Sequence, residues 1–383
     1  MTCFFVENKS IISIKVKIIN FLWHFSTGGI GKCFLTYNKL GDVASNLYIK
    51  SVCVILDSKP CDCQPLLVHG IEMIHIKGYF DFSWMTKMKD IVNEEKPDAF
   101  FCHGHNGPIM LSLLQMCNRI RIPMICTCHG VNLDVTKKTN RFLSMLWMYI
   151  YKQRIVRKVI CVEQYTPPLL FKKGIDKDKV VTVYNGINPS SDVAPINLAQ
   201  YCKDVPVIIS ASRLTRIKGI NYLIDALAIL KEKKVKFCYF CIGNGEEEEI
   251  LKGQAKKRGL TNGEIYFIGY QNNVPEWLAT CDIFVLPSLE EFHSIAILEA
   301  MRAQKAIVAT DIGGNPESLR DGKDALLVPA MNTDALAEAL IRLLTDNELR
   351  NYLSRNAHEQ FEKRFTIDVM MRNLANEILS TKL

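Results

Sequence analysis

Short apolar runs rich in Val and Ile alternate with amphipathic stretches along the whole chain, and this alternation constrains the fold more than any other feature. It is typical of repeated strand and helix units on a parallel sheet whose strands are buried on both faces. A first set of strands is predicted at residues 14–23, 50–56, 72–76, 99–103, 123–128, 158–162 and 180–183. A second set is predicted at 207–212, 236–243, 264–269, 282–287, 306–310 and 325–328. We therefore expect an α/β protein with two doubly wound sheets.

The chain length favours two domains. Its 383 residues, 48% of them hydrophobic, exceed what one ordinary α/β core takes up. A polar, proline-containing stretch at 189–206 is typical of an interdomain linker. We predict domains at residues 1–190 and 191–365, followed by an amphipathic helix at 366–383, with a break near Asp346 in the helix that begins near Asp334.

Charge and cysteine content indicate which surfaces the protein meets and in which compartment it functions. Residues 1–190 carry a formal charge of +10 and residues 191–383 carry −3, so the first half is the one expected to meet anionic surfaces. The 14 cysteines lie in apolar runs rather than in a disulfide or zinc pattern, and no signal peptide or membrane span is evident. We expect reduced thiols and a cytoplasmic location.

The strongest local motif runs from Pro287 to Met301, where a strand leads into a helix that Ser294 can cap. Glu291 precedes this helix and Glu299 lies on it, while the first helical N–H groups near Ile295 can face phosphates. Taken alone, the two carboxylates could be a helix-start charge and a solvated residue. Glu299 stands between Leu298 and Ala300, however, which favours a buried carboxylate that needs partners.

A second motif, residues 210–219, brings Arg213 and Lys218 to the carboxyl edge of a strand. Ligands of open α/β sheets bind beyond this edge, so the two cations and the Glu291 loop are expected to share one crevice. The alternative is a pair of surface cations in salt bridges.

Glycines and histidines follow other predicted strands. The glycine-rich turn of Gly28, Gly29 and Gly31 lets backbone amides approach an anion or a sugar, but the hydroxyl residue of a Walker motif is missing after Lys32. His129 ends a strand at the mouth of the expected cleft, either as a reacting group or as a structural histidine. His103 and His105 could line an acceptor groove or bind a metal, and we favour the acceptor role.

Residues 137–158 combine an apolar, aromatic middle with basic flanks. Such a helix can rest on an anionic membrane, or it can be a core helix with charged ends. The aromatic residues slightly favour the interpretation as a membrane-bound helix.

Together these motifs resemble the retaining enzymes of glycosyltransferase family 4, which have the GT-B fold of two Rossmann-like domains facing each other across a cleft. The Glu-x7-Glu element at Glu291 and Glu299 is the most specific mark of the resemblance. Further matches, in family order, are Gly28–Gly31, His129-Gly130, residues 184–188, Arg213 with Lys218-Gly219, Gly243-Asn-Gly245 and residues 311–317.

The resemblance implies a role for each matched residue. Arg213 and Lys218 would bind the donor diphosphate, Glu299 the ribose and Glu291 the donor sugar, while His129 would meet a sugar hydroxyl near the reacting carbon. The remaining expected donor contacts are Gly28, Gly29, Gly31, Gly243, Gly269, Tyr270, Ser294 and Ile295, with the backbone at Gly269 and Tyr270 holding the base. Phe292 and His293 stand where the family often has Gly-Phe, which puts the identity of the sugar in doubt.

The expected function is the retaining transfer of a hexose or N-acetylhexosamine from a UDP- or GDP-sugar, without a metal or other cofactor. The acceptor would be a lipid-linked or growing glycan in bacterial surface polysaccharide synthesis, and the terminal helix would pack back on the first domain. An anionic membrane surface, met through 137–158, is a further expected partner, and nucleic acid is not expected. Two alternatives stay open: a GT-B-shaped sugar-nucleotide epimerase and a non-catalytic sugar-nucleotide binding protein.

Overall fold

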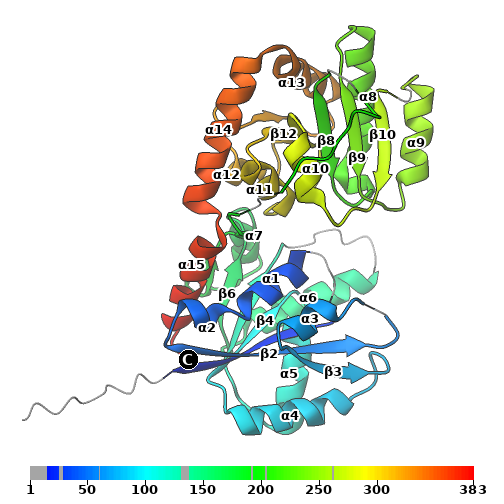
Figure 1. Ribbon diagram of the computed structural model, residues 1–383. Coiled ribbons are helices and arrows are strands. Elements are labelled where there is room, and N and C mark those ends of the chain that lie inside the picture. Colours follow the sequence, from blue (N-terminus) through cyan, green and yellow to red (C-terminus); the bar gives the residue numbers. More distant parts are fainter. Residues whose placement is uncertain are drawn as a thin grey trace, which may run out of the picture.

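Two parallel sheets, each covered by helices, form the two lobes of the molecule (Figure 1). The structure is a computed structural model that describes residues 15–25, 29–59, 61–130, 138–190, 193–202, 205–260 and 263–383, with the backbone alone at 29 and 138–143. Both predicted sets of strands are present, which confirms the α/β class.

The first sheet has seven parallel strands in the order β3-β2-β1-β4-β5-β6-β7. They are β1 (Val16–Trp23), β2 (Leu47–Leu56), β3 (Glu72–Ile76), β4 (Ala99–His103), β5 (Met124–Cys128), β6 (Val156–Cys161) and β7 (Val180–Thr182). The helices between them are α1 (Gly29–Tyr37), α2 (Leu40–Val43), α3 (Gln64–Val68), α4 (Ser83–Glu95), α5 (Asn106–Asn118), α6 (Lys138–Lys152) and α7 (Thr166–Lys172).

The second sheet has six parallel strands in the order β10-β9-β8-β11-β12-β13. They are β8 (Val207–Ala211), β9 (Cys238–Ile242), β10 (Ile265–Gly269), β11 (Ile283–Leu286), β12 (Ala306–Thr310) and β13 (Leu326–Val328). The helices α8 (Ile220–Glu232), α9 (Glu248–Lys257), α10 (Val274–Thr280), α11 (Ile295–Arg302), α12 (Asn315–Ser318) and α13 (Thr333–Thr345) complete this lobe. In both sheets the order reverses beside the first strand, which opens a crevice at the carboxyl ends.

The last two helices run back from the second lobe to the first (Figure 1). The predicted break falls at Asp346, whose carboxylate caps α14 (Asn347–Arg364) by accepting from the N–H of Leu349 at 2.8 Å. Helix α15 (Ile367–Leu379) then buries Met371, Leu374 and Ile378 in a cluster with residues of the first sheet. This segment therefore ties the second lobe to the core of the first.

The interior explains the cysteine pattern. All cysteines of the described residues are free thiols, and those on the strands are buried between sheet and helices. They act as small apolar side chains in the core.

Candidate functional site

A pocket of about 380 Å³ lies where the carboxyl ends of the two sheets face each other. Residues of both lobes line it. From the first lobe come Ile30, Cys33, His129, Val162 and Asn185, and from the second come Ala211, Ser212, Arg213, Lys218, Leu286 and residues 291–296. The pocket thus gathers His129, Arg213, Lys218, Glu291, Ser294 and Ile295 from the residues that the sequence singled out.

Lys218 and Glu291 form an ion pair inside this pocket. The ammonium lies 2.7 and 2.9 Å from the two carboxylate oxygens, and the side chains are only 16% and 12% exposed. Arg213, on the loop after β8, is exposed, and within the described part of the chain its guanidinium has no hydrogen bond or ion pair. Lys218 is therefore held in place, whereas Arg213 is free to bind an anion.

Helix α11 points its first turn at the pocket. The Ser294 hydroxyl caps it by accepting from the N–H of Ile297, and Ile295 and Ala296 are in the pocket wall. The N–H groups of a first helical turn have no partner within the helix, so they can donate to phosphate oxygens.

Glu299 lies one turn further along α11. It is 19% exposed rather than fully buried, so the expectation of a buried carboxylate is only partly right. Its partner is Lys32 of α1, 3.6 Å away and in the opposite lobe. The pair joins the lobes on the side of α11 that faces the first domain.

His129 forms the opposite wall. Its Nε2 is 3.1 Å from the Thr127 hydroxyl. Burial, reinforced by His105, lowers the pKa of His129 to about 4, so the ring is neutral at physiological pH. A neutral imidazole can accept or donate a hydrogen bond without adding charge.

The residue after His129 brings the lobes into contact. Gly130 has a φ of +122°, and a Cβ at this position would overlap the ring of Phe292. Phe292 therefore lies flush against the first lobe. The bulky residue that departs from the family pattern fills space between the lobes.

His293 is turned away from solvent. Its ring contacts Tyr184 and Phe365, and neither ring nitrogen has a partner among the described residues. Burial, with a contribution from Arg364, lowers its pKa to about 3. Its carbonyl accepts from the Asn185 side chain at 3.2 Å, which fixes the loop that carries Glu291 against the first lobe.

A carboxylate contact also joins the lobes beside the pocket. Glu317 accepts from the backbone N–H groups of Gln164 and Tyr165 at 2.6 and 2.8 Å. Glu163 lies next to them, fully buried, and burial together with the nearby Glu317 raises its pKa to about 7. Glu163 thus titrates near neutral pH inside a contact between domains.

The predicted glycine positions lie in two parts of the molecule, one in each lobe. Gly28 lies outside the described residues, Gly29 begins α1, and Gly31 is buried within that helix. Gly243 follows β9, and its N–H donates to the carbonyl of Gly269 at 2.8 Å. Tyr270 is exposed next to this pair, and neither Gly269 nor Tyr270 lines the pocket.

One expectation from the sequence needs correction, and another stays open. The predicted acceptor role of His103 is wrong, because both ring nitrogens are engaged in the core, one with Thr127 and the other with Asn20. Helix α6 buries Trp147, Ile150 and Tyr151 against the sheet, whereas Met145 and Tyr149 on the same helix are exposed, so the membrane contact of residues 137–158 stays a prediction. His105 stacks on the same Trp147.

Sequence reasoning missed the contacts that cross between the lobes. In the sequence, Lys32 belongs only to an incomplete phosphate-binding motif, and Asn185 has no predicted role. Nothing local marks Lys32, whereas Asn185 stands in the motif 184–188 that the resemblance had already singled out. Among the described residues, no cluster of three or more His, Cys, Asp or Glu could hold a metal ion, and no helix could span a membrane.

Comparison with known proteins gives two matching family models. The model described as Glycosyl transferases group 1 matches residues 200–360, and the model described as Glycosyltransferase Family 4 matches residues 62–191. The division between the two matches falls in the segment between β7 and β8.

Two relatives and one solved structure extend the likeness. The lipopolysaccharide core biosynthesis glycosyltransferase LpsE of Rhizobium meliloti is 31% identical over 61% of this chain and 70% of that protein. The UDP-Gal:alpha-D-GlcNAc-diphosphoundecaprenol alpha-1,3-galactosyltransferase of Escherichia coli is 23% identical over 79% of each chain. The structure of HepE from Anabaena in complex with UDP has a TM-score of 0.78 at 18% identity, over 95% of this chain and 100% of that one. The expected GT-B architecture is confirmed.

Proposed function

The chain belongs to the group 1 glycosyl transferases of glycosyltransferase family 4, and from this premise we propose that it moves a hexose or N-acetylhexosamine from a UDP- or GDP-sugar to a lipid-linked or growing glycan. The observation that carries the proposal is the pocket between the lobes, where two cations, a carboxylate and a helix N-terminus meet a neutral histidine. The cations and the helix N-terminus suit the diphosphate of a nucleotide sugar, and the carboxylate and the histidine suit the hydroxyl groups of its sugar.

The donor diphosphate would lie between Arg213, Lys218 and the first turn of α11. Arg213 is exposed and unpaired within the described residues, so it can take up an anion without first breaking a contact. Cations and helix N–H groups aimed at the departing phosphate stabilise the negative charge that develops as the sugar bond breaks. We propose that these groups suffice without a metal ion.

The donor sugar would lie between Glu291 and His129. The Lys218–Glu291 pair supports this placement. When a diphosphate also binds the Lys218 ammonium, the Glu291 carboxylate becomes free to accept hydrogen bonds from sugar hydroxyls. Glu299 would accept from the ribose once Lys32 moves aside, and Gly269 with Tyr270 would hold the base. Retention at the anomeric carbon is part of the proposal.

The acceptor would approach from the first lobe. That lobe carries the positive charge of the chain, +10 over residues 1–190, which favours an anionic acceptor such as a diphosphate-linked glycan. The Escherichia coli relative is named for a diphosphoundecaprenol-linked acceptor, which supports the same acceptor class here. Surface polysaccharide synthesis is the process in which such a transfer belongs.

A donor screen tests the proposal. Purified protein is mixed with UDP- and GDP-sugars and a polyprenyl-diphosphate glycan, and nucleoside diphosphate release is measured. We expect release with one donor that depends on the acceptor. The Glu291→Ala variant should abolish it, while Glu290→Ala, one residue earlier, should retain it.

Two results would contradict transfer. Conversion of the donor without any acceptor would favour the epimerase, and tight donor binding in calorimetry with no turnover on any acceptor would favour the binding protein. The named relatives are transferases and favour neither alternative.

A further inference from the structure

A row of buried polar side chains crosses the first sheet behind His129. It consists of Ser51 on β2, Asn20 on β1, His103 on β4 and Thr127 on β5, and these four strands lie next to one another. All four side chains are at most 4% exposed. Polar groups in the core of a sheet are costly unless they bond to one another, so their hydrogen bonds decide what this polar row does.

The Asn20 side chain has one defined orientation. Its amide nitrogen donates to the Ser51 hydroxyl at 2.7 Å and lies 3.5 Å from the backbone carbonyl of Phe34. A carbonyl only accepts hydrogen bonds, so the nitrogen is the end of the amide that faces Phe34. The amide oxygen then faces His103, 2.5 Å from its Nε2.

His103 therefore carries its proton on one defined nitrogen. Because the Asn20 oxygen only accepts, Nε2 of His103 is the protonated nitrogen. Phe34, Tyr37 and Phe101 surround the ring, and burial, reinforced by His129, lowers the pKa of His103 well below its usual value. A neutral imidazole has a single N–H, so Nδ1 of His103 is left as an acceptor.

Thr127 connects this ring to His129. Its hydroxyl lies 2.9 Å from Nδ1 of His103 and 3.1 Å from Nε2 of His129. The hydroxyl has one proton, which it donates to His103, so its oxygen can only accept from His129. The carbonyl of Cys102 is 3.5 Å from the same hydroxyl, and a proton turned toward it would also leave an accepting oxygen for His129. In both cases Nε2 of His129 carries the proton.

The other nitrogen of His129 is left for a ligand. The low pKa of His129 keeps its ring neutral at physiological pH, so the ring has only the one N–H that faces Thr127. Nδ1 has no hydrogen-bond partner among the described residues, and the side chain lines the interlobe pocket. Nδ1 can therefore accept a hydrogen bond from a ligand but cannot donate one.

We propose that the polar row holds His129 in the tautomer with its proton on Nε2, so that Nδ1 accepts from a hydroxyl group of the donor sugar. Thr127, His103, Asn20 and Ser51 are positioning residues, because they act through the His129 ring. A ring without this row divides its population between two tautomers, and one of them cannot accept at Nδ1. The contact with the sugar rests on the proposed function, whereas the tautomer exists in the free protein.

The tautomer can be measured without any donor. In protein labelled at the histidine nitrogens, two-bond proton–nitrogen correlation spectra separate protonated from unprotonated ring nitrogens. The His129→Asn variant identifies the signals of His129 by their loss. We expect His129 to be protonated on Nε2 alone. Protonation on Nδ1, or an equal mixture of the two tautomers, would overturn the proposal.

Two variants of Thr127 test its connection to His129. Thr127→Val keeps the shape of the side chain and removes the hydroxyl, so we expect mixed tautomers at His129. With one hydrogen bond lost, kcat/KM for transfer should fall by about tenfold. Thr127→Ser keeps the hydroxyl and should restore both the tautomer and most of the activity. An unchanged tautomer in Thr127→Val would refute the connection.

A matched control separates the polar row from threonines in general. Thr182→Val removes a hydroxyl from β7 that lies 3.5 Å from the carbonyl of Glu163, outside the polar row, and it should change neither the tautomer nor transfer. Mixed tautomers in Thr127→Val with undiminished transfer would contradict the contact between His129 and the sugar. The absence of transfer in wild-type protein would count against the proposed function and leave the tautomer result standing.

The far end of the polar row has its own test. The double variant Asn20→Leu/His103→Phe replaces both bonded partners by apolar side chains, so neither is left buried opposite a lost partner. The Thr127 proton can then turn toward Nε2 of His129, and we expect mixed tautomers although neither replaced side chain is hydrogen-bonded to His129. Melting curves establish that the variant is folded. An unchanged tautomer in the folded variant would contradict the role of Asn20 and His103.

Discussion

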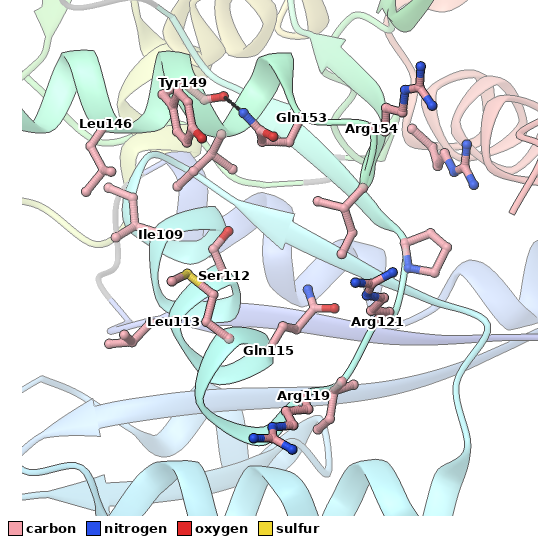
Figure 2. A pocket seen from close by; sticks show the side chains of 16 residues that line it. Ile109, Ser112, Leu113, Gln115, Arg119, Arg121, Leu146, Tyr149, Gln153 and Arg154 are labelled. Carbon is pink, nitrogen blue, oxygen red and sulfur yellow. Dashed lines mark hydrogen bonds between the residues drawn. The ribbon is translucent and has the colours of Figure 1, made fainter.

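The interlobe pocket and the hollow between α5 and α6, which we name the α5–α6 groove, both gather positive charge, but they hold it differently. In the pocket, Lys218 is paired with Glu291 and both are largely buried. In the groove, four arginines are exposed without partners in the described part of the chain, namely Arg119, Arg121, Arg154 and Arg157 (Figure 2). A buried pair fixes its side chains and fails when one partner is removed, whereas an exposed cation can be lost at almost no cost to the fold. The difference separates a site that fixes its charges in place from a surface whose charges the fold does not need.

Breaking the pair in the pocket should have the largest effect. Lys218→Met leaves the Glu291 carboxylate without its cation, and we expect transfer to fall by about 10²–10³-fold because diphosphate stabilisation is lost. Stability should fall by about 1–3 kcal/mol in urea unfolding. The double variant Lys218→Met/Glu291→Gln should recover stability but not activity. If Lys218→Met were as stable as the wild type, the Lys218–Glu291 pair would be solvated rather than buried, and this prediction would fail.

The next largest effect concerns Glu163, the buried carboxyl group between the lobes, and the dependence of stability on pH. The pKa of Glu163 rises from 4.5 to about 7 through burial and the nearby Glu317, so between these values the unfolded chain releases a proton that the folded chain keeps. The stability it supplies is full below pH 4.5 and is lost as the pH rises through 7. Glu163→Gln should therefore gain stability over wild type by up to about 3 kcal/mol on going from pH 4.5 to pH 8.

Urea unfolding at several pH values measures this difference. The Glu338→Gln variant, which removes a carboxyl group from an exposed position, serves as the control. A flat difference for Glu163→Gln would mean that this carboxyl ionises normally in the folded protein. The comparison between variants cancels the contribution of every other titrating group.

The contact between Gly130 and Phe292 should give a smaller effect. Gly130→Ala adds a methyl group that overlaps the Phe292 ring and forces alanine to a φ of +122°, so we expect a loss of about 1–3 kcal/mol. Phe292→Ala in the same chain should recover the part due to overlap and leave the part due to backbone strain. Thermal unfolding of Gly130→Ala, of Phe292→Ala and of the double variant measures both parts, and no recovery in the double variant would refute the contact.

Removing charge from the groove should have the smallest effect on the fold. The variant with Gln at 119, 121, 154 and 157 is expected to keep its stability within about 0.5 kcal/mol, because these guanidinium groups have no partners to lose in the described chain. Its turnover on a water-soluble acceptor should stay within about twofold of wild type. A marked loss of either quantity would show that the arginines support the lobe itself.

Most of the fold could be predicted from the sequence, and the errors are informative. Strand β2 begins at Leu47 rather than at residue 50, because Leu47, Tyr48 and Ile49 also pair with β1, and this pairing depends on a segment about 30 residues earlier in the chain. His103 looked like a surface ligand because it ends a strand, yet Asn20, 83 residues away, engages its ring. A partner that distant in the chain leaves no local pattern.

The sequence by itself determined the two sets of strands, the cap at Ser294, the helix break near Asp346, and the carboxylate and cations that meet in the pocket, because periodicity, capping and strand-end placement are local properties. Only the tertiary structure decided that Lys32 meets Glu299, that Phe292 lies on Gly130, and that arginines from two segments of the chain line one groove. These contacts join segments far apart in the chain, and they form only when the packing of whole lobes brings their side chains together.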